Sequence, residues 1–182
     1  MLFNNKISST YLINLSLFLI PVSYIAGNLI LNLNIIILII IALASFGKEI
    51  FLQKMALIDK LLILIFAYIV LNGFLNNAYN FNFLDSPDKN IVLKKSLLYI
   101  RFLFLYFVIK FLIFKRIINY NFLFLIFGGC SLFVSIDIIF QYLVGFDLLG
   151  FEGGGRRLSG PFGEEYVAGS FIQRFFIFLP FF

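Results

Sequence analysis

Long apolar runs are the feature that most constrains this sequence. Six mainly hydrophobic stretches follow one another with short polar segments between them, at residues 11–31, 33–46, 57–75, 96–114, 122–144 and 166–182. An α-helix rises about 1.5 Å per residue, so a run of about 20 residues crosses the roughly 30 Å hydrocarbon core of a bilayer. The alternation expected of barrel strands is absent. The sequence therefore predicts an all-α, polytopic bundle of about six transmembrane helices.

The composition excludes several function classes. Hydrophobic residues make up 62% of the 182 residues and charged residues 13%, against about 45–50% and about 25% in soluble domains. A single core of this size cannot bury so much apolar surface. We therefore expect neither a soluble enzyme, nor a disordered tail, nor a nucleic-acid-binding protein, although the formal net charge is +5.

The residues used most often in metal and nucleophile chemistry are scarce. The chain contains no histidine, and Cys130 is its only cysteine. A usual zinc site, a Ser-His or Cys-His pair and an internal disulfide are therefore excluded from this chain. We expect no metal and no other cofactor.

The first apolar run has a competing interpretation as a secretory signal peptide, because Lys6 precedes it and Ala26 follows it. The small-x-small cleavage pattern is missing, since Tyr24 stands two residues before Ala26, and a second apolar run follows at once. We therefore expect a membrane span.

Cations between the runs are the usual guide to orientation. Across six spans they divide equally, with seven on each side. We predict a cytoplasmic amino terminus, because the connection after the first run has no cation and the cations on the outer side stand beside acidic residues. The last run is still apolar where the sequence ends, so we expect a piece of a longer protein with further spans.

Four polar residues lie inside or beside predicted spans, where they are costly. Asp137 and Gln141 are four residues apart, which places them on one helix face. Arg101 lies within the fourth run, and we hypothesise that it approaches Asp137; a functional site and a structural ion pair both stay open. Arg174, in the last run, is expected to point into a polar cavity or to extend to the interface.

The connection at residues 146–165 reads FDLLGFEGGGRRLSGPFGEE. Its glycines permit tight bends, and Arg156 and Arg157 supply donors suited to phosphate oxygens. The pattern of a nucleotide-binding P-loop is absent. One interpretation is an anion site for a lipid phosphate or pyrophosphate, and the other is an Arg pair that anchors the loop at the interface. Glu164 and Glu165 fit a helix amino terminus, and the alternatives are a general base or partners for Arg156 and Arg157.

Residues 137–169 read DIIFQYLVGFDLLGFEGGGRRLSGPFGEEYVAG, and this stretch resembles the O-antigen ligase and O-antigen polymerase family of bacterial inner-membrane proteins. The matching positions are Asp137, Gln141-Tyr142, Gly145, Asp147, Gly150, Arg157, Ser159, Gly160, Phe162 and Gly169. The resemblance implies the amino-terminal half of a multi-pass glycosyltransferase. Residues 1–136 would be its amino-terminal transmembrane helices, and residues 137–182 the start of the shared core, with the outer loop 146–165 and a truncated last span.

The resemblance also implies substrates. Such proteins use a glycan carried on undecaprenyl pyrophosphate at the periplasmic face, without a metal. The ligase transfers the glycan to lipid A-core, and the polymerase extends a growing chain. The expected partners are therefore this lipid-linked donor, one of the two acceptors and membrane lipid, with no nucleic acid.

Candidate site residues follow from this chemistry. The catalytic candidates are Arg157, Glu165 and Asp137. The candidates for binding substrate or pyrophosphate are Arg156, Arg157, Arg101, Gln141 and Arg174. The important histidine of the ligases belongs to a later loop, and this chain has none, so we do not expect the chain to be active alone. Two alternatives stay open: a transporter or flippase, supported by Asp137 and Arg174, and a non-catalytic membrane assembly subunit.

Overall fold

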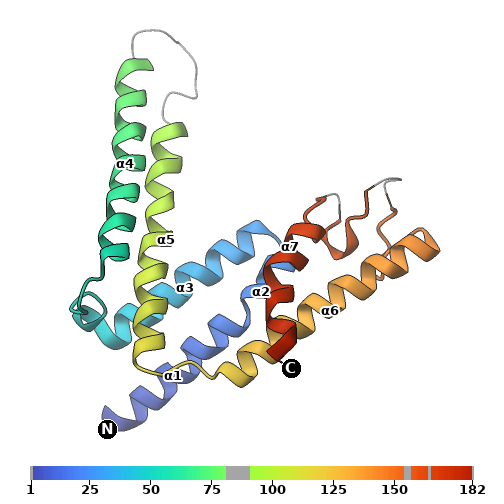
Figure 1. The fold of residues 1–182 in the computed structure, drawn as a ribbon, viewed down its shortest axis with the longest axis horizontal. Coiled ribbons are helices and arrows are strands. Elements are labelled where there is room, and N and C mark those ends of the chain that lie inside the picture. The colour runs from blue at the N-terminus through green and yellow to red at the C-terminus, as the bar shows by residue number, and fades with distance from the viewer. Residues whose placement is uncertain (1, 81–90, 154–156, 164, 182) are drawn as a thin grey trace. The chain divides into compact units, whose positions relative to one another are not determined.

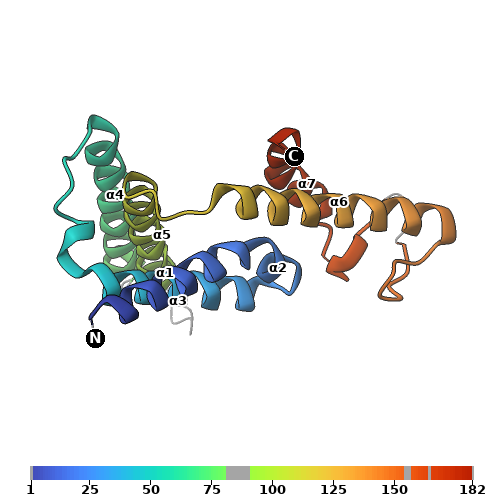
Figure 2. The same ribbon diagram turned by 90° about the horizontal axis from the view of Figure 1, so that it is seen from below.

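The computed structural model describes residues 2–80, 91–153, 157–163 and 165–181. The helices in chain order are α1 (Leu2–Phe18), α2 (Ile20–Ile25), α3 (Asn28–Phe46), η1 (Gly47–Ile50), α4 (Leu57–Asn80), α5 (Ile91–Phe114), α6 (Tyr120–Val144), η2 (Gly160–Phe162), α7 (Ala168–Phe175) and η3 (Phe176–Phe181). Figures 1 and 2 show these helices. The described part of the chain has no named strand, which confirms the all-α prediction.

Four helices are long and apolar enough to cross a membrane, and they correspond to the second to fifth predicted spans. These segments are Asn28–Ile50, Leu57–Asn77, Ile91–Phe114 and Tyr120–Val144. The prediction of six spans is therefore wrong for the first and last apolar runs. Four candidate spans suggest a multi-pass membrane protein.

Backbone breaks explain both errors. In the first run α2 has only six residues, and Gly27 follows it with φ +116°, a conformation that glycine adopts readily and other residues rarely. In the last run α7 has eight residues and continues as a 3₁₀-helix that contains Pro180. Proline has no amide hydrogen to donate and disfavours continued α-helix.

The smaller number of crossings changes the expected orientation. If the four candidate spans all cross, an even number, the residues before α3 and the loop after α6 are expected on the same side of the membrane. A cytoplasmic amino terminus and an extracytoplasmic loop at residues 146–165 are therefore compatible only if the segment of α1 and α2 also crosses. Three candidate spans separate the segment 51–56 from the loop in the sequence, and one separates the segment 115–119 from it; both numbers are odd, so we expect these segments on the side of the membrane opposite the loop.

The chain divides into two compact units, residues 42–115 and residues 1–41 with 116–182. In the first unit α4 and α5 run side by side (Figures 1 and 2). Gly73 of α4 is buried against Ser96 of α5, where a Cβ atom would overlap the serine side chain. A small residue at this point lets the two helix backbones approach closely.

In the other unit α7 and η3 pack along α6. The apolar core consists of Phe127, Val134, Ala168, Phe171 and Phe175. The rings of Phe127 and Phe175 meet edge to face, with centroids 5.3 Å apart. Polar contacts hold α1 in place: the Asn14 side chain donates to the Ile117 carbonyl (3.0 Å) and accepts from the Asn119 amide (3.0 Å).

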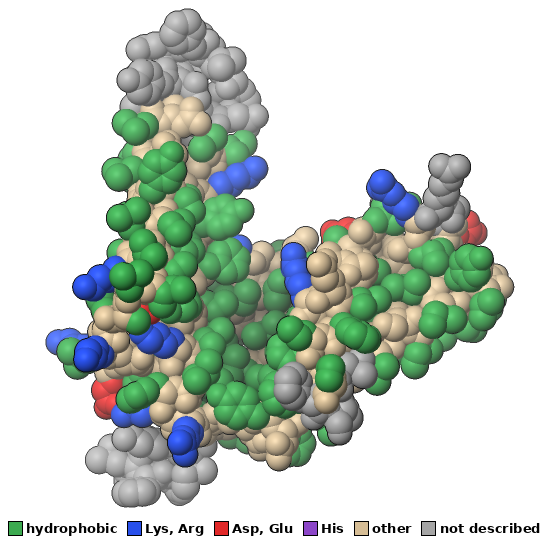
Figure 3. Space-filling view, in the orientation of Figure 1, with side chains coloured by type: hydrophobic (Ala, Val, Ile, Leu, Met, Phe, Trp, Pro, Cys, Tyr) green, Lys and Arg blue, Asp and Glu red, His purple; other side chains and the backbone are tan. Residues whose placement is uncertain are grey.

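Large apolar side chains cover the outer faces of the candidate spans. On α4, Leu57, Leu64 and Tyr68 are 76%, 65% and 62% exposed, and Figure 3 shows hydrophobic side chains along the length of the α4–α5 pair. Soluble monomers rarely expose such a continuous apolar surface. These faces are therefore suited to contact with lipid.

Candidate functional site

The loop after α6 folds back onto the end of that helix. α6 ends at Gly145, whose φ of +93° turns the chain and whose amide donates to the Gln141 carbonyl (2.9 Å). The Gly153 amide then donates to the Gly145 carbonyl (2.9 Å). Phe146 and Glu152 form an isolated antiparallel bridge. Residues 145–153 are thus a closed loop at one end of a candidate span.

Asp147 organises the interior of this closed loop. Its side chain is 1% exposed, and one carboxylate oxygen accepts from the amides of Leu149 (3.0 Å) and Phe151 (2.6 Å). Asp and Asn favour turns because their side chains can satisfy nearby backbone amides in this way. The Gly-x-Asp-x-x-Gly pattern at residues 145–150 therefore stabilises this turn: Gly145 caps α6, and Asp147 accepts hydrogen bonds from the loop amides.

Asp137 and Gln141 attach the loop to α6. An Asp137 carboxylate oxygen accepts from the Leu148 amide (2.9 Å). Gln141 accepts from the Gly160 amide (2.9 Å) and donates to the Phe151 carbonyl (3.3 Å). Both side chains are buried, and both contact the same loop, which confirms that they share one helix face. The structure gives both residues a positioning role, and their predicted contacts with substrate stay predictions.

Two carboxylate oxygens of this site lack partners. Oδ2 of Asp137 and Oδ2 of Asp147 are buried and make no hydrogen bond within the part of the chain that is described. Buried polar atoms are normally satisfied, and leaving one unsatisfied is costly. These oxygens are therefore unfilled acceptors beside the loop.

Two of the four charged candidates in the loop, Arg157 and Glu165, are among the described residues. Arg157 is exposed two residues before Ser159, and its guanidinium carbon lies 6.0 Å from the centre of the Tyr166 ring. Glu165 is also exposed, and its amide donates to the Phe162 carbonyl (3.2 Å). Arg156 and Glu164 lie outside the described residues.

Arg174 and Arg101 are not part of the loop 146–165: Arg174 belongs to α7 and Arg101 to α5. Arg174 is exposed and donates to the Tyr24 hydroxyl (3.1 Å), with its guanidinium 5.5 Å from the ring centre. It therefore joins α7 to α2. Arg101 belongs to the other unit, where it lies 4.9 Å from the centre of the Phe102 ring and its Nε has no partner within the described residues. The pairing of Arg101 with Asp137 would join the two units and stays a prediction.

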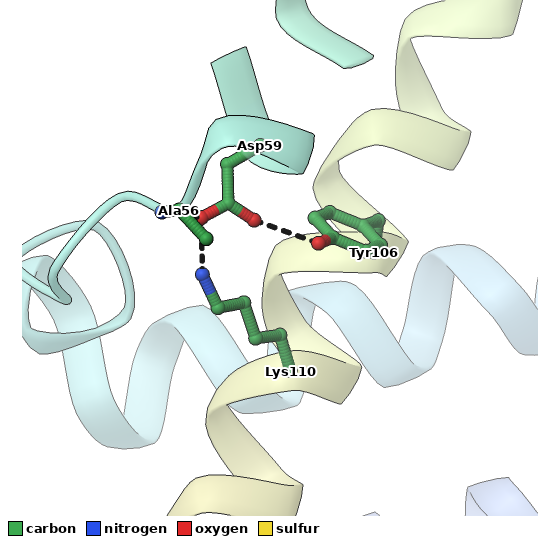
Figure 4. Close-up of polar contacts among 4 residues, drawn as sticks. All are labelled: Ala56, Asp59, Tyr106 and Lys110. Carbon is green, nitrogen blue, oxygen red and sulfur yellow. Dashed lines mark hydrogen bonds and ion pairs between the residues drawn. The ribbon is translucent and has the colours of Figure 1, made fainter. Parts of the chain in front are cut away.

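Sequence reasoning missed a second polar cluster, in which Asp59 at the start of α4 meets Tyr106 and Lys110 of α5 (Figure 4). The buried Asp59 carboxylate accepts from the Tyr106 hydroxyl (2.7 Å), from the Ala56 amide (2.6 Å) and from the Lys110 ammonium. Tyr106 and Lys110 are four residues apart on one helix face, a signal that the sequence contained.

No group of three or more His, Cys, Asp or Glu side chains suited to a metal ion occurs among the described residues. Comparison of the chain with protein-family models, with curated proteins and with solved structures gave no significant match. The resemblance to the ligase and polymerase family therefore rests on the motif at residues 137–169.

Replacing Gln141 with leucine will loosen the loop, because the Gly160 amide loses its buried acceptor. Leaving a buried donor unsatisfied costs about 1–3 kcal/mol, so backbone amides at residues 145–153 and 157–163 should exchange with deuterium about 5- to 150-fold faster. Hydrogen exchange measured by mass spectrometry tests this. Gln173→Leu, at an exposed position of α7, is the matched control and should leave exchange unchanged. Equal protection in Gln141→Leu and wild type would contradict the positioning role.

Proposed function

We propose that the chain belongs to a membrane glycan ligase or polymerase of the bacterial inner membrane. It would act at the periplasmic face on an oligosaccharide linked to undecaprenyl pyrophosphate. The acceptor would be lipid A-core for a ligase or the growing glycan for a polymerase, as in the synthesis of lipopolysaccharide O-antigen or a related surface polysaccharide. The resemblance of residues 137–169 to that family is the starting point of this proposal.

The observation that carries the proposal is the fixed loop at the end of α6. Asp137 and Gln141 hold its backbone from inside the helix, while Arg157 stays exposed. The loop follows a candidate span directly, so it lies where a lipid pyrophosphate headgroup would be. A loop whose described backbone is held by these hydrogen bonds and that carries an exposed guanidinium suits recognition of phosphate oxygens.

The chemistry of glycan transfer determines which roles the candidate residues would have. An acceptor hydroxyl attacks the anomeric carbon, the bond from that carbon to the pyrophosphate oxygen breaks, and undecaprenyl pyrophosphate leaves with the electron pair. Arg157 would stabilise the negative charge that develops on the leaving oxygen. Glu165 would take the hydroxyl proton, since it is exposed, whereas the Asp137 carboxylate is buried and already holds the Leu148 amide.

The test is a transfer assay with the complete protein in lipid nanodiscs. The donor is a fluorescent oligosaccharide on undecaprenyl pyrophosphate, and the acceptors are lipid A-core and free glycan. We expect fluorescent product on one acceptor, with release of undecaprenyl pyrophosphate in equal amount. Absence of transfer, together with movement of the donor between leaflets of proteoliposomes, would contradict the proposal and favour a flippase.

A further inference from the structure

A pocket of about 430 Å³ lies at the end of the α4–α5 pair where α4 begins and α5 ends. It is entirely within the unit of residues 42–115. Its lining comes from η1 with the segment after it and from the end of α5: Glu49, Leu52, Gln53, Lys54, Lys110, Phe111, Phe114 and Lys115. In Figure 3 Lys and Arg side chains gather around this end of the α4–α5 pair.

The charge of the pocket is positive. Three lysines and one acidic residue, Glu49, line it; Lys110 is paired with the buried Asp59 carboxylate, so Lys54 and Lys115 supply the remaining positive charge. Lys115 lies 3.5 Å from the Glu49 carboxylate, but both side chains are about half exposed, and such surface pairs are weak. Lys54 makes no hydrogen bond or ion pair with the residues that the structure describes. At least one ammonium group is therefore free to bind an anion.

The side-chain amide of Gln53 is independent evidence that a hydrogen-bond acceptor binds here. Its Nε2 is buried and has no hydrogen-bond acceptor within the described chain. An amide nitrogen can only donate, so the atom that would satisfy it must be an acceptor. Gln53 lines the pocket, and rotation of its side chain toward the pocket would bring this amide nitrogen to a phosphate oxygen there.

The remaining walls indicate a lipid rather than a soluble anion. Leu52 and Phe114 are 80% and 73% exposed beside the lysines. The pocket also lies where two candidate spans end, at the start of α4 and the end of α5, which is the depth of the lipid headgroups. Basic pockets between transmembrane helices are suited to anionic headgroups.

We propose that this pocket binds the headgroup phosphate of an anionic membrane phospholipid. Lys54 and Lys115 contact the phosphate, Gln53 donates to one of its oxygens, and the acyl chains lie against Leu52 and Phe114. The site is separate from the loop after α6 and does not depend on the proposed transferase activity.

Native mass spectrometry of the complete protein in detergent tests the proposal, with phosphatidylglycerol or phosphatidylcholine added at the same concentration. Wild type should retain phosphatidylglycerol at least about 10-fold more strongly. Each lysine near an anionic headgroup contributes a factor of about 5, so the double variant Lys54→Gln/Lys115→Gln should bind it about 25-fold more weakly. Lys54→Arg/Lys115→Arg, which keeps both charges, should keep most of the binding.

The matched control is Lys94→Gln/Lys95→Gln, at exposed positions near the other end of α5; it should bind like wild type. Equal binding of the two lipids, or equal loss in the two glutamine variants, would overturn the proposal. Displacement of phosphatidylglycerol by millimolar inorganic phosphate would also overturn it, because the site would then be one for free phosphate.

Discussion

Replacing Lys110 with methionine will lower the Tm of the protein by about 10 °C. The variant leaves the buried Asp59 carboxylate with the Tyr106 hydroxyl and the Ala56 amide but without its cation. Breaking a buried ion pair by removing one partner costs far more than the pair contributes, because a buried charge stays uncompensated. Thermal unfolding of the complete protein in one detergent, followed by circular dichroism, measures the shift.

Lys115→Met is the matched control, because Lys115 directly follows the last residue of the same helix and pairs with exposed Glu49. Its Tm should change by no more than about 3 °C. The double variant Asp59→Leu/Lys110→Met removes both charges and should recover most of the lost stability. If Lys110→Met and Lys115→Met unfold at the same temperature, the cluster does not hold α4 and α5 together.

Replacing Arg157 with alanine will lower the rate of glycan transfer about 100- to 1000-fold, the usual effect of removing one group that stabilises transition-state charge. The loss should appear in kcat more than in KM, because the leaving oxygen gains its charge as the bond breaks. Arg157 is exposed, and its guanidinium carbon lies 6.0 Å from the centre of the Tyr166 ring. The fold should therefore tolerate the change, which the Tm checks.

Two variants control this experiment. Arg157→Lys keeps the charge but loses the planar donors, so an intermediate rate is expected. Lys60→Ala removes an exposed cation from α4 and should transfer glycan at the wild-type rate. A normal rate in Arg157→Ala, at normal expression, would remove this residue from the mechanism.

The middle of the fold was predictable because four long apolar runs each form one continuous helix. The run predicted at residues 57–75 is α4, and that at residues 122–144 is α6, with ends differing by a few residues. The prediction of a membrane span was wrong for the first and last runs because the backbone changes conformation within each of them. Hydropathy does not report the backbone conformation of Gly27, which follows the end of α2, or the change from α-helix to 3₁₀-helix at Phe176 in the segment that contains Pro180.

The site was predictable only where spacing along one helix decided it. Spacing alone placed Asp137 and Gln141 on one face, but their partners, the Leu148 and Gly160 amides, depend on the path of the loop. Asp59 was missed because its partner Lys110 is 51 residues away in the sequence. Contacts between distant segments follow from packing, which hydropathy and motifs do not report.

The most direct test of the central claim asks on which side of the membrane the loop after α6 lies. Cys130 is first replaced by alanine, and single cysteines are then introduced as Leu149→Cys in the exposed part of the loop and Lys54→Cys on the opposite side. Intact cells are treated with a membrane-impermeant maleimide. We predict that Leu149→Cys is labelled and that Lys54→Cys is labelled only after permeabilisation. The reverse pattern would place the loop in the cytosol, out of reach of a periplasmic donor, and would contradict the proposed function.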